Sequence, residues 1–215
     1  FARSAVAADI SERSVLFAEF NRRLNNVDNA ICLAGDLYEP VSGQQFNTIV
    51  AHPPYVPVLR PKYIYHDGGE DGEGIVRRVV AEAPPVLAPG GQLYLMAMVS
   101  DRDGEPFEER VREWLGEWSS ECDVALFPMH SLDPEDFAAR AVLTNSSPGD
   151  DFRAFRTLFK KLRVRQLVYV VLRVQRRAAE RPVFTIRRQA ALSTPPSAID
   201  AAMAWETKLQ ELGPA

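Results

Sequence analysis

The sequence lacks the features that mark several large classes of protein. It has only two cysteines, Cys32 and Cys122, which lie far apart in apolar segments and are predicted to be buried, reduced thiols. Apolar runs such as 166–172 are far shorter than the roughly 20 residues of a membrane span. No group of His, Cys and carboxylate residues has the spacing of metal ligands. We therefore expect a cytoplasmic globular protein with no membrane partner and no metal site.

Charge is unevenly distributed along the chain. The net charge is −4, yet residues 151–190 hold twelve Lys or Arg against two acids, Asp151 and Glu180. A basic block of this size suits an anionic partner such as RNA. It suits equally a solvated helix face followed by the polar edges of two strands, and the sequence leaves both possibilities open.

Apolar periodicity predicts strands that alternate with helices. The predicted strands are 4–8, 30–34, 46–51, 92–99, 124–127, 166–174 and 183–186. The first predicted helix is capped by Ser11 and places Leu16, Phe17, Phe20 and Leu24 on one face. The other predicted helices cover about 73–88, 105–117, 151–163 and 196–212, with one more that starts at Asp133-Pro134.

The order of these elements predicts the fold class. Strands 166–174 and 183–186 have no helix between them, so we expect them to pair antiparallel. Strands that alternate with helices and end in such a pair are typical of a Rossmann-like α/β fold with a doubly wound, mostly parallel sheet. We expect one domain over 1–190 and a helical appendage over 191–215.

Three predicted loops that follow successive strands carry polar groups. Asp9 follows the first strand, Asp36 the second, and 52–55 the third. Ligands of open α/β sheets bind at the carboxyl ends of the strands. A carboxylate such as that of Asp9 commonly accepts hydrogen bonds from the hydroxyls of a ribose, and Asp36 is placed to accept one from the exocyclic amine of adenine. An Asp after a strand is more often a cap or a turn residue, so the prediction rests on the three loops together.

The tetrapeptide His52-Pro53-Pro54-Tyr55 is the most specific local signal. Each proline fixes its own φ, removes a backbone donor and keeps the preceding residue extended. The segment is therefore predicted to be a stiff loop whose carbonyls have no strand to pair with, beside an aromatic ring. Such acceptors suit a planar group that carries N–H donors. The long irregular segment 56–72 that follows is predicted to be functional and either lines the same site or anchors the loop.

The stretch from Ala7 to Val99 resembles the class I S-adenosylmethionine-dependent methyltransferases of the small-domain group. It is most similar to those that methylate planar nitrogens, the release-factor glutamine and nucleic-acid adenine or guanine methyltransferases. The matching segments are Ala8-Asp9-Ile10-Ser11, Gly35-Asp36-Leu37-Tyr38, His52 to Pro57, Asp67 to Gly72 and Leu87 to Gly91.

The resemblance implies a cofactor and roles for particular residues. The cofactor is S-adenosyl-L-methionine, and the residues implied to bind it are Asp9, Ile10, Gly35, Asp36 and Leu37. The implied catalytic loop consists of His52, Pro53, Pro54 and Tyr55. Tyr55, Tyr63 and Tyr65 are expected to contact the methyl acceptor.

The chain departs from the family pattern at two places. The family's first strand and glycine-rich turn are missing, and we expect them upstream of Phe1. His52 stands where the family has Asn or Asp. A neutral imidazole offers a single acceptor nitrogen, or it serves as a base toward a hydroxyl or carboxyl substrate.

These observations lead to one principal hypothesis and three alternatives. The principal hypothesis is methyl transfer to a planar nitrogen of a protein glutamine or a nucleobase, with an acceptor that is RNA, a ribosome-associated protein or a small molecule. The alternatives are a small-molecule O- or N-methyltransferase that uses His52 as acceptor or base, a nicotinamide-dependent oxidoreductase, and a non-catalytic scaffold of the same fold.

Overall fold

The structure is a computed structural model that describes residues 2–143 and 148–212. The chain divides into two compact units, Phe1–Gln45 and Phe46–Ala215. Each unit has its own sheet and is described by itself.

The first unit is a small β-α-β arrangement. Its strands β1 (Ala5–Asp9) and β2 (Ala30–Ala34) are parallel, with helix α1 (Glu12–Leu24) between them in the chain and a short 3₁₀ helix, Glu39–Val41, after β2. The predicted cap is confirmed, because the Ser11 hydroxyl accepts a 3.3 Å hydrogen bond from the Ser14 N–H.

The apolar residues of α1 recur at helical spacing, as predicted, but the face that they form is not buried. A helix buries such a stripe only where a wide enough apolar surface lies against it. None of the residues of α1 is buried, and four large side chains of this face are more than half exposed, namely Leu16, Phe17, Phe20 and Leu24.

The second unit contains a five-stranded mixed sheet with the order β3-β4-β6-β5-β7. The strands are β3 (Phe46–Ala51), β4 (Leu87–Arg102), β5 (Cys122–Leu132), β6 (Val164–Arg176) and β7 (Thr185–Arg187). The pairs β3–β4 and β5–β7 are parallel, whereas β6 runs antiparallel to both β4 and β5. The predicted α/β fold class is therefore confirmed, and β6 is the antiparallel strand of this sheet.

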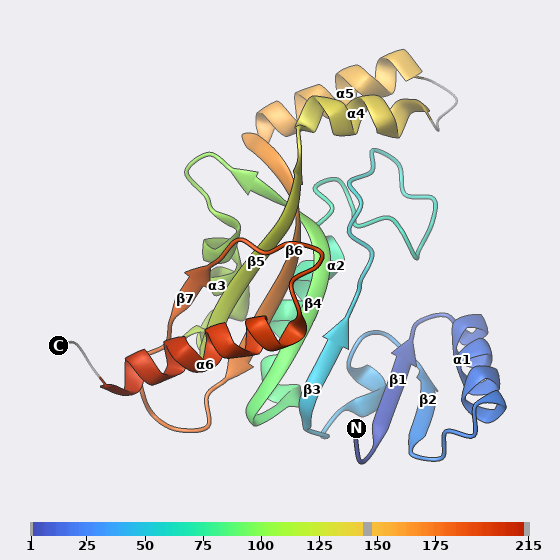
Figure 1. The fold of residues 1–215 in the computed structure, drawn as a ribbon. Coiled ribbons are helices and arrows are strands. Elements are labelled where there is room, and N and C mark those ends of the chain that lie inside the picture. Colours follow the sequence, from blue (N-terminus) through green and yellow to red (C-terminus); the bar gives the residue numbers. More distant parts are fainter. Residues whose placement is uncertain (1, 144–147, 213–215) are drawn as a thin grey trace. The chain divides into compact units, whose positions relative to one another are not determined.

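The predicted pairing of the last two strands with each other is wrong. Helices α4 (Pro134–Leu143) and α5 (Pro148–Lys161) lie as a pair beyond one end of the sheet, so the chain re-enters next to β5 in the opposite direction (Figure 1). Both edges of β6 are then occupied, by β4 and by β5. The next strand, β7, joins the remaining edge of β5 and runs parallel to it.

Helices cover both faces of this sheet (Figure 1). Helices α2 (Gly74–Glu82) and α3 (Phe107–Leu115) lie on one face, where Val76, Val80 and Phe107 are fully buried. Helix α6 (Pro196–Leu212) crosses the other face, where Met203 packs against a cluster that includes Ala125 and Phe127. The domain boundary expected at residue 190 stays a prediction.

The helix predicted over 73–88 is shorter in the structure. It ends at Glu82, and Pro84 and Pro85 start a 3₁₀ turn that leads into β4 at Leu87. The cause is the pair of prolines, which removes two backbone donors. Gly91 then lets β4 approach β3, because a Cβ there would lie 2.7 Å from the Phe46 carbonyl oxygen. The strand therefore begins five residues earlier than predicted.

Two features are absent from the residues that the structure describes. No helix in 2–143 or 148–212 is both long and apolar enough to cross a bilayer. Nor do three or more His, Cys, Asp or Glu side chains of these ranges gather where they could hold a metal ion.

Candidate functional site

Within the first unit, the carboxyl ends of β1 and β2 bring the predicted cofactor residues to one edge. Asp9 is in register with Ala34, and its carbonyl accepts a 3.1 Å hydrogen bond from the Gly35 N–H. The Asp9 side chain uses Oδ1 to accept a 2.8 Å bond from the Ser11 N–H, which orients the carboxylate. The exposed side chain of Ile10 follows it.

The loop after β2 has a conformation that depends on its glycine. A Cβ at Gly35 would lie 2.3 Å from Cγ of Pro40, so no larger residue fits without moving the chain. Leu37 has φ +46°, and the Asp36 carbonyl accepts a 3.0 Å bond from the Glu39 N–H. The loop is thus a tight turn that places Asp36 immediately beyond β2.

In the second unit, the His52-Pro53-Pro54-Tyr55 segment continues from β3 as a loop. Val56, which follows it, is hydrogen-bonded through its backbone to the segment around Asp67. The Gly68 N–H donates to the Val56 carbonyl at 2.9 Å, and the Val56 N–H donates to the His66 carbonyl at 3.1 Å. In the described part of the chain, the carbonyls of Pro53 and Pro54 accept no backbone hydrogen bond. These carbonyls therefore remain as acceptors, as the sequence predicts for a loop of this kind.

The Asp-Gly-Gly segment holds this loop at very short range. A Cβ on Gly68 would lie 2.4 Å from the Gly72 carbonyl oxygen and 2.8 Å from Cα of Tyr55. Both atoms belong to the backbone, so neither yields as a flexible side chain would.

Replacing Gly68 by alanine is therefore expected to lower the free energy of unfolding by about 1–3 kcal/mol, the usual cost of overpacking. Gly149→Ala is the matched control, because a methyl group there meets no described atom within 4 Å. Urea denaturation of both variants checks the prediction. Equal stability of the two variants would show that the loop contact is not tight.

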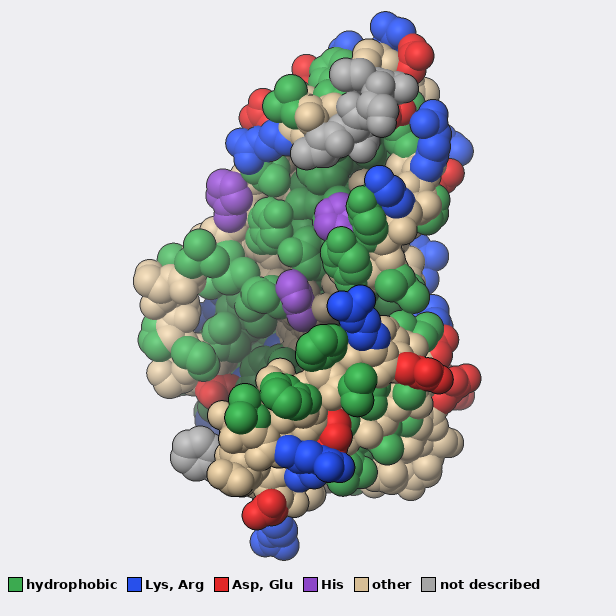
Figure 2. Space-filling model, turned by 90° about the vertical axis from the view of Figure 1, so that its right-hand side faces the viewer, with side chains coloured by type: hydrophobic (Ala, Val, Ile, Leu, Met, Phe, Trp, Pro, Cys, Tyr) green, Lys and Arg blue, Asp and Glu red, His purple; other side chains and the backbone are tan. Residues whose placement is uncertain are grey.

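Tyr55 belongs to a row of four rings. Its ring centroid lies 5.3 Å from that of His52 and 6.1 Å from that of Tyr169, which it meets edge to face at 87°. His130 stacks on Tyr169 with a centroid distance of 6.4 Å and an interplanar angle of 22°. We call His52, Tyr55, Tyr169 and His130 the aromatic row. All three histidines of the chain appear on one face, together with hydrophobic side chains (Figure 2).

One side of Tyr55 is buried. It packs against a core cluster that includes Met98, Phe137 and Leu167. Burial, together with the nearby Tyr169, raises the pKa of the Tyr55 phenol above its ordinary value. The phenol therefore stays neutral at physiological pH, and His52 at the other end of the loop is exposed.

The structure does not bring Tyr63 and Tyr65 to the aromatic row. Their rings contact each other at 5.5 Å, and the side chains are 43% and 77% exposed. Asp67 anchors this loop, since its carboxylate accepts hydrogen bonds from the N–H groups of Lys62 and Tyr63 and from His66. Burial opposes ionisation of Asp67, but these bonds hold its pKa below the ordinary value. Contact of Tyr63 and Tyr65 with an acceptor stays a prediction.

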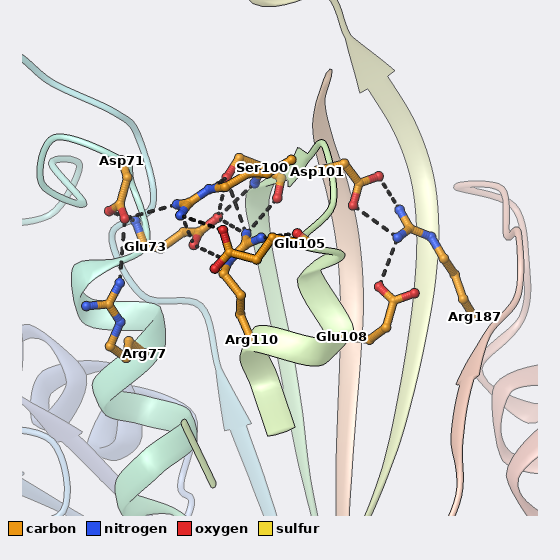
Figure 3. Close-up of polar contacts among 10 residues, drawn as sticks. Asp71, Glu73, Arg77, Ser100, Asp101, Glu105, Glu108, Arg110 and Arg187 are labelled. Carbon is orange, nitrogen blue, oxygen red and sulfur yellow. Dashed lines mark hydrogen bonds and ion pairs between the residues drawn. The ribbon is translucent and has the colours of Figure 1, made fainter. Parts of the chain in front are cut away.

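A buried charged network fixes the other end of the Asp-Gly-Gly segment (Figure 3). Glu73 is 0% exposed, and its Oε1 accepts bonds from the Ser100 N–H at 2.9 Å, the Ser100 hydroxyl at 2.7 Å and Nη2 of Arg110 at 2.7 Å. Its Oε2 accepts from Arg102 at 3.2 Å, and Arg102 also pairs with Asp71 at 3.2 Å. The network ties the loop to β4 and α3.

Two contributors to this site, His130 and Glu73, were missed at the sequence level. His130 has no partner nearby in the sequence, and it meets Tyr169 only because β5 and β6 place the two directly opposite each other. Glu73 reads as a surface residue in the first turn of a helix. Its burial follows from Arg110, which is 37 residues away in the chain. Arg77 and Arg78 follow Glu73 at about one helical turn in the sequence, so no local signal separates it from an ordinary surface acid.

The basic block over 151–190 is largely neutralised within the protein. Most of its arginines form ion pairs with acids, as Arg187 does with Asp101 and Glu108 at the right of Figure 3. The arginines paired in this way are Arg153, Arg156, Arg173, Arg176, Arg181, Arg187 and Arg188. Five cations of the block make no ion pair among the described residues, and these are Lys160, Lys161, Arg163, Arg165 and Arg177.

Three relatives that share sequence with this chain are named as methyltransferases. It is 35% identical over 98 residues to the release factor glutamine methyltransferase of Thermodesulfovibrio yellowstonii, which covers 40% of this chain and 35% of that protein. The chain is 36% identical over 101 residues to a putative protein N5-glutamine methyltransferase of Methanocaldococcus jannaschii. This match covers 44% of this chain and 50% of that protein. The chain is 32% identical over 140 residues to the ribosomal protein uL3 glutamine methyltransferase of Bradyrhizobium diazoefficiens. This match covers 59% of this chain and 44% of that protein.

These relatives are longer than the part that matches. The chain spans between about a third and a half of the length of each of them. A family model described as the methyltransferase small domain matches residues 2–118, which is more than half of the chain. The chain therefore belongs to the methyltransferase small domain family, a group of class I S-adenosylmethionine-dependent methyltransferases.

Proposed function

We propose that this protein transfers a methyl group from S-adenosylmethionine to a planar nitrogen, and that the acceptor is the side-chain amide of a protein glutamine. The observation that carries the proposal is the loop after β3, where the exposed His52 ring, the unpaired carbonyls of Pro53 and Pro54 and the ring of Tyr55 lie together. Family membership favours this reaction over the nicotinamide-dependent alternative.

For methyl transfer, the protein mainly has to position the acceptor amide relative to the methyl donor. A neutral imidazole nitrogen of His52 and a loop carbonyl would each accept one N–H of the acceptor amide. The ring of Tyr55 would lie against the plane of that amide. Together these contacts orient the nitrogen lone pair, and positioning of this kind accounts for much of the rate gain in a displacement reaction.

The residues at the edge of the first unit suit the cofactor. Asp9 is exposed and holds its carboxylate in place through Ser11, as a group that accepts ribose hydroxyls must. Asp36 stands on the neighbouring turn and would accept an exocyclic amine, with Ile10, Gly35 and Leu37 beside them. The cofactor supplies the activated methyl group on its sulfonium centre.

Two observations favour a protein over a nucleic acid as acceptor. Two of the relatives named above are a release factor glutamine methyltransferase and a ribosomal protein glutamine methyltransferase, and the third is named as a putative protein N5-glutamine methyltransferase. Most arginines of the basic block are already paired with carboxylates, so they would have to break those pairs to bind phosphates. A cytoplasmic location, expected from the sequence, stays a prediction.

The acceptor is tested by transfer of labelled methyl groups. The purified protein is incubated with methyl-labelled S-adenosylmethionine and a cell extract, which is then separated into protein, RNA and small molecules. We expect label in protein, and peptide mass spectrometry should find it as a methyl group on glutamine. Label confined to RNA or to small molecules would contradict the proposed acceptor.

His52→Asn is expected to retain methyl transfer to an amide. An asparagine side-chain oxygen accepts the same N–H bond as a neutral imidazole nitrogen. His52→Ala, which removes the acceptor, is expected to lower kcat by about 10²-fold. Rates of both variants on the same acceptor fraction check this. Complete loss in His52→Asn would instead indicate that His52 acts as a base toward a hydroxyl or carboxyl group.

A further inference from the structure

A cavity of about 470 Å³ opens beside the far end of the aromatic row, within the second unit. It lies where β4 and β5 end and β6 begins, and Arg187 at the end of β7 and Gln189 after it also line the cavity. His130, the last ring of the row, is one of its lining residues. The cavity is therefore two ring contacts away from Tyr55.

Ion pairs and a hydrogen bond hold the side chains of one wall of this cavity in place. Arg187 is held there by Asp101 and by Glu108, as Figure 3 shows. Gln166 donates a 2.9 Å hydrogen bond to the same Asp101 carboxylate. These groups are satisfied by one another, so they shape the cavity more than they attract a ligand.

Other lining groups have no such partners. In the described ranges, Arg165 forms neither an ion pair nor a side-chain hydrogen bond, and the same is true of the Asp103 carboxylate and the Ser131 hydroxyl. All three residues line the cavity and are exposed. Together they offer one cation, one anion and one hydroxyl.

The charge balance argues against a phosphate-rich ligand. The lining contains three arginines and three acids, and Asp101 and Glu108 lie directly at the wall. Nucleic acids are held by a surplus of cations around their phosphates. Carboxamides and hydroxyls both donate and accept, as Gln166, Gln189 and Ser131 can, and they match the alternating N–H and C=O groups of a polypeptide backbone.

The lining leaves one cation, Arg165, and one anion, Asp103, without a partner among the described residues, and further unpaired cations lie near Arg165 in the chain. Arg165 lies close in the chain to Lys160, Lys161 and Arg163, which also make no ion pairs among the described residues. A guanidinium forms its strongest hydrogen bonds with a carboxylate, which it engages through two N–H groups. The part of the cavity lined by Arg165 therefore favours an acidic side chain.

We propose that this cavity is a docking subsite for a polypeptide segment that carries an acidic residue, whose carboxylate pairs with Arg165. That the segment belongs to the methyl acceptor rests on the proposed function, because the subsite lies next to the aromatic row. The binding itself requires neither the cofactor nor methyl transfer.

The test measures peptide binding by fluorescence polarisation with the full-length protein and no S-adenosylmethionine. The probes are three labelled hexapeptide pools with random flanks and Glu, Gln or Lys at a central position. We expect the Glu pool to bind at least about tenfold more tightly than the Lys pool. Arg165→Gln should abolish that preference. Lys160→Gln, the same charge change outside the cavity lining, should keep it.

Several results would overturn the proposal. Equal affinity for the three pools would do so, and so would an unchanged preference in Arg165→Gln with a native thermal transition. Displacement of the Glu pool by inorganic phosphate or by a single-stranded RNA oligomer at equal concentration would point to an anion site instead. A protein that binds the Glu pool through Arg165 but transfers no methyl group would leave the subsite standing and contradict the proposed function alone.

Discussion

Replacing Glu73 by alanine is expected to lower the free energy of unfolding by about 3–5 kcal/mol, the usual cost of removing one partner from a buried ion pair. The variant leaves Arg110, which is 2% exposed, without its carboxylate, and it leaves the Ser100 hydroxyl without its acceptor. The loss should appear as a lower urea midpoint. Because the network anchors the segment that packs on Tyr55, methyl transfer should fall as well.

Two further variants separate the network from its surroundings. Glu105→Gln changes a carboxylate that lies 3.8 Å from Arg102 and is 46% exposed, so its effect should stay below about 1 kcal/mol. The double variant Glu73→Leu with Arg110→Met removes both buried charges and should recover much of the loss. A cost of less than 1 kcal/mol for Glu73→Ala would contradict the role assigned to the network.

Replacing Tyr55 by alanine is expected to lower kcat for methyl transfer by about 10²-fold, the size of effect that follows when reacting groups lose their alignment. The ring is the part of the loop that would lie against the acceptor plane, and it also holds its neighbours His52 and Tyr169 in place. Initial rates at saturating S-adenosylmethionine measure the change.

The control for this prediction keeps the ring. Tyr55→Phe removes only the hydroxyl, for which the structure shows no hydrogen bond among the described residues, and it should retain most of the rate. If Tyr55→Phe loses as much activity as Tyr55→Ala, the hydroxyl rather than the ring is the functional group. If neither variant loses activity, Tyr55 is a packing residue of the cluster that contains Phe137.

Local signals in the sequence located most elements and the loops that follow them. Ser11, Asp133-Pro134 and the two prolines after His52 act through their own backbone geometry, so they mark helix starts and a stiff loop without knowledge of the rest of the fold. The strand and helix boundaries that follow from them agree with the structure to within a few residues in most places. The helix expected over 73–88 is the main exception, because Pro84-Pro85 ends it.

What the sequence could not predict depends on distant pairing. The position of β6 between β4 and β5 decides that His130 meets Tyr169, that β7 pairs with β5, and that a cavity forms at this end of the sheet. The burial of Glu73 likewise depends on Arg110. Neither contact has a signature in the residues that flank it.

The central claim is that this protein is an S-adenosylmethionine-dependent enzyme. A calorimetric titration tests that claim most directly. The full-length protein is titrated with S-adenosylmethionine and, separately, with NAD, and the titrations are repeated with Asp9→Ala. We expect saturable binding of S-adenosylmethionine, weakened at least about tenfold in the variant, and no binding of NAD. Binding of NAD in place of S-adenosylmethionine, or binding of neither with Asp9 and Asp36 intact, would contradict this account.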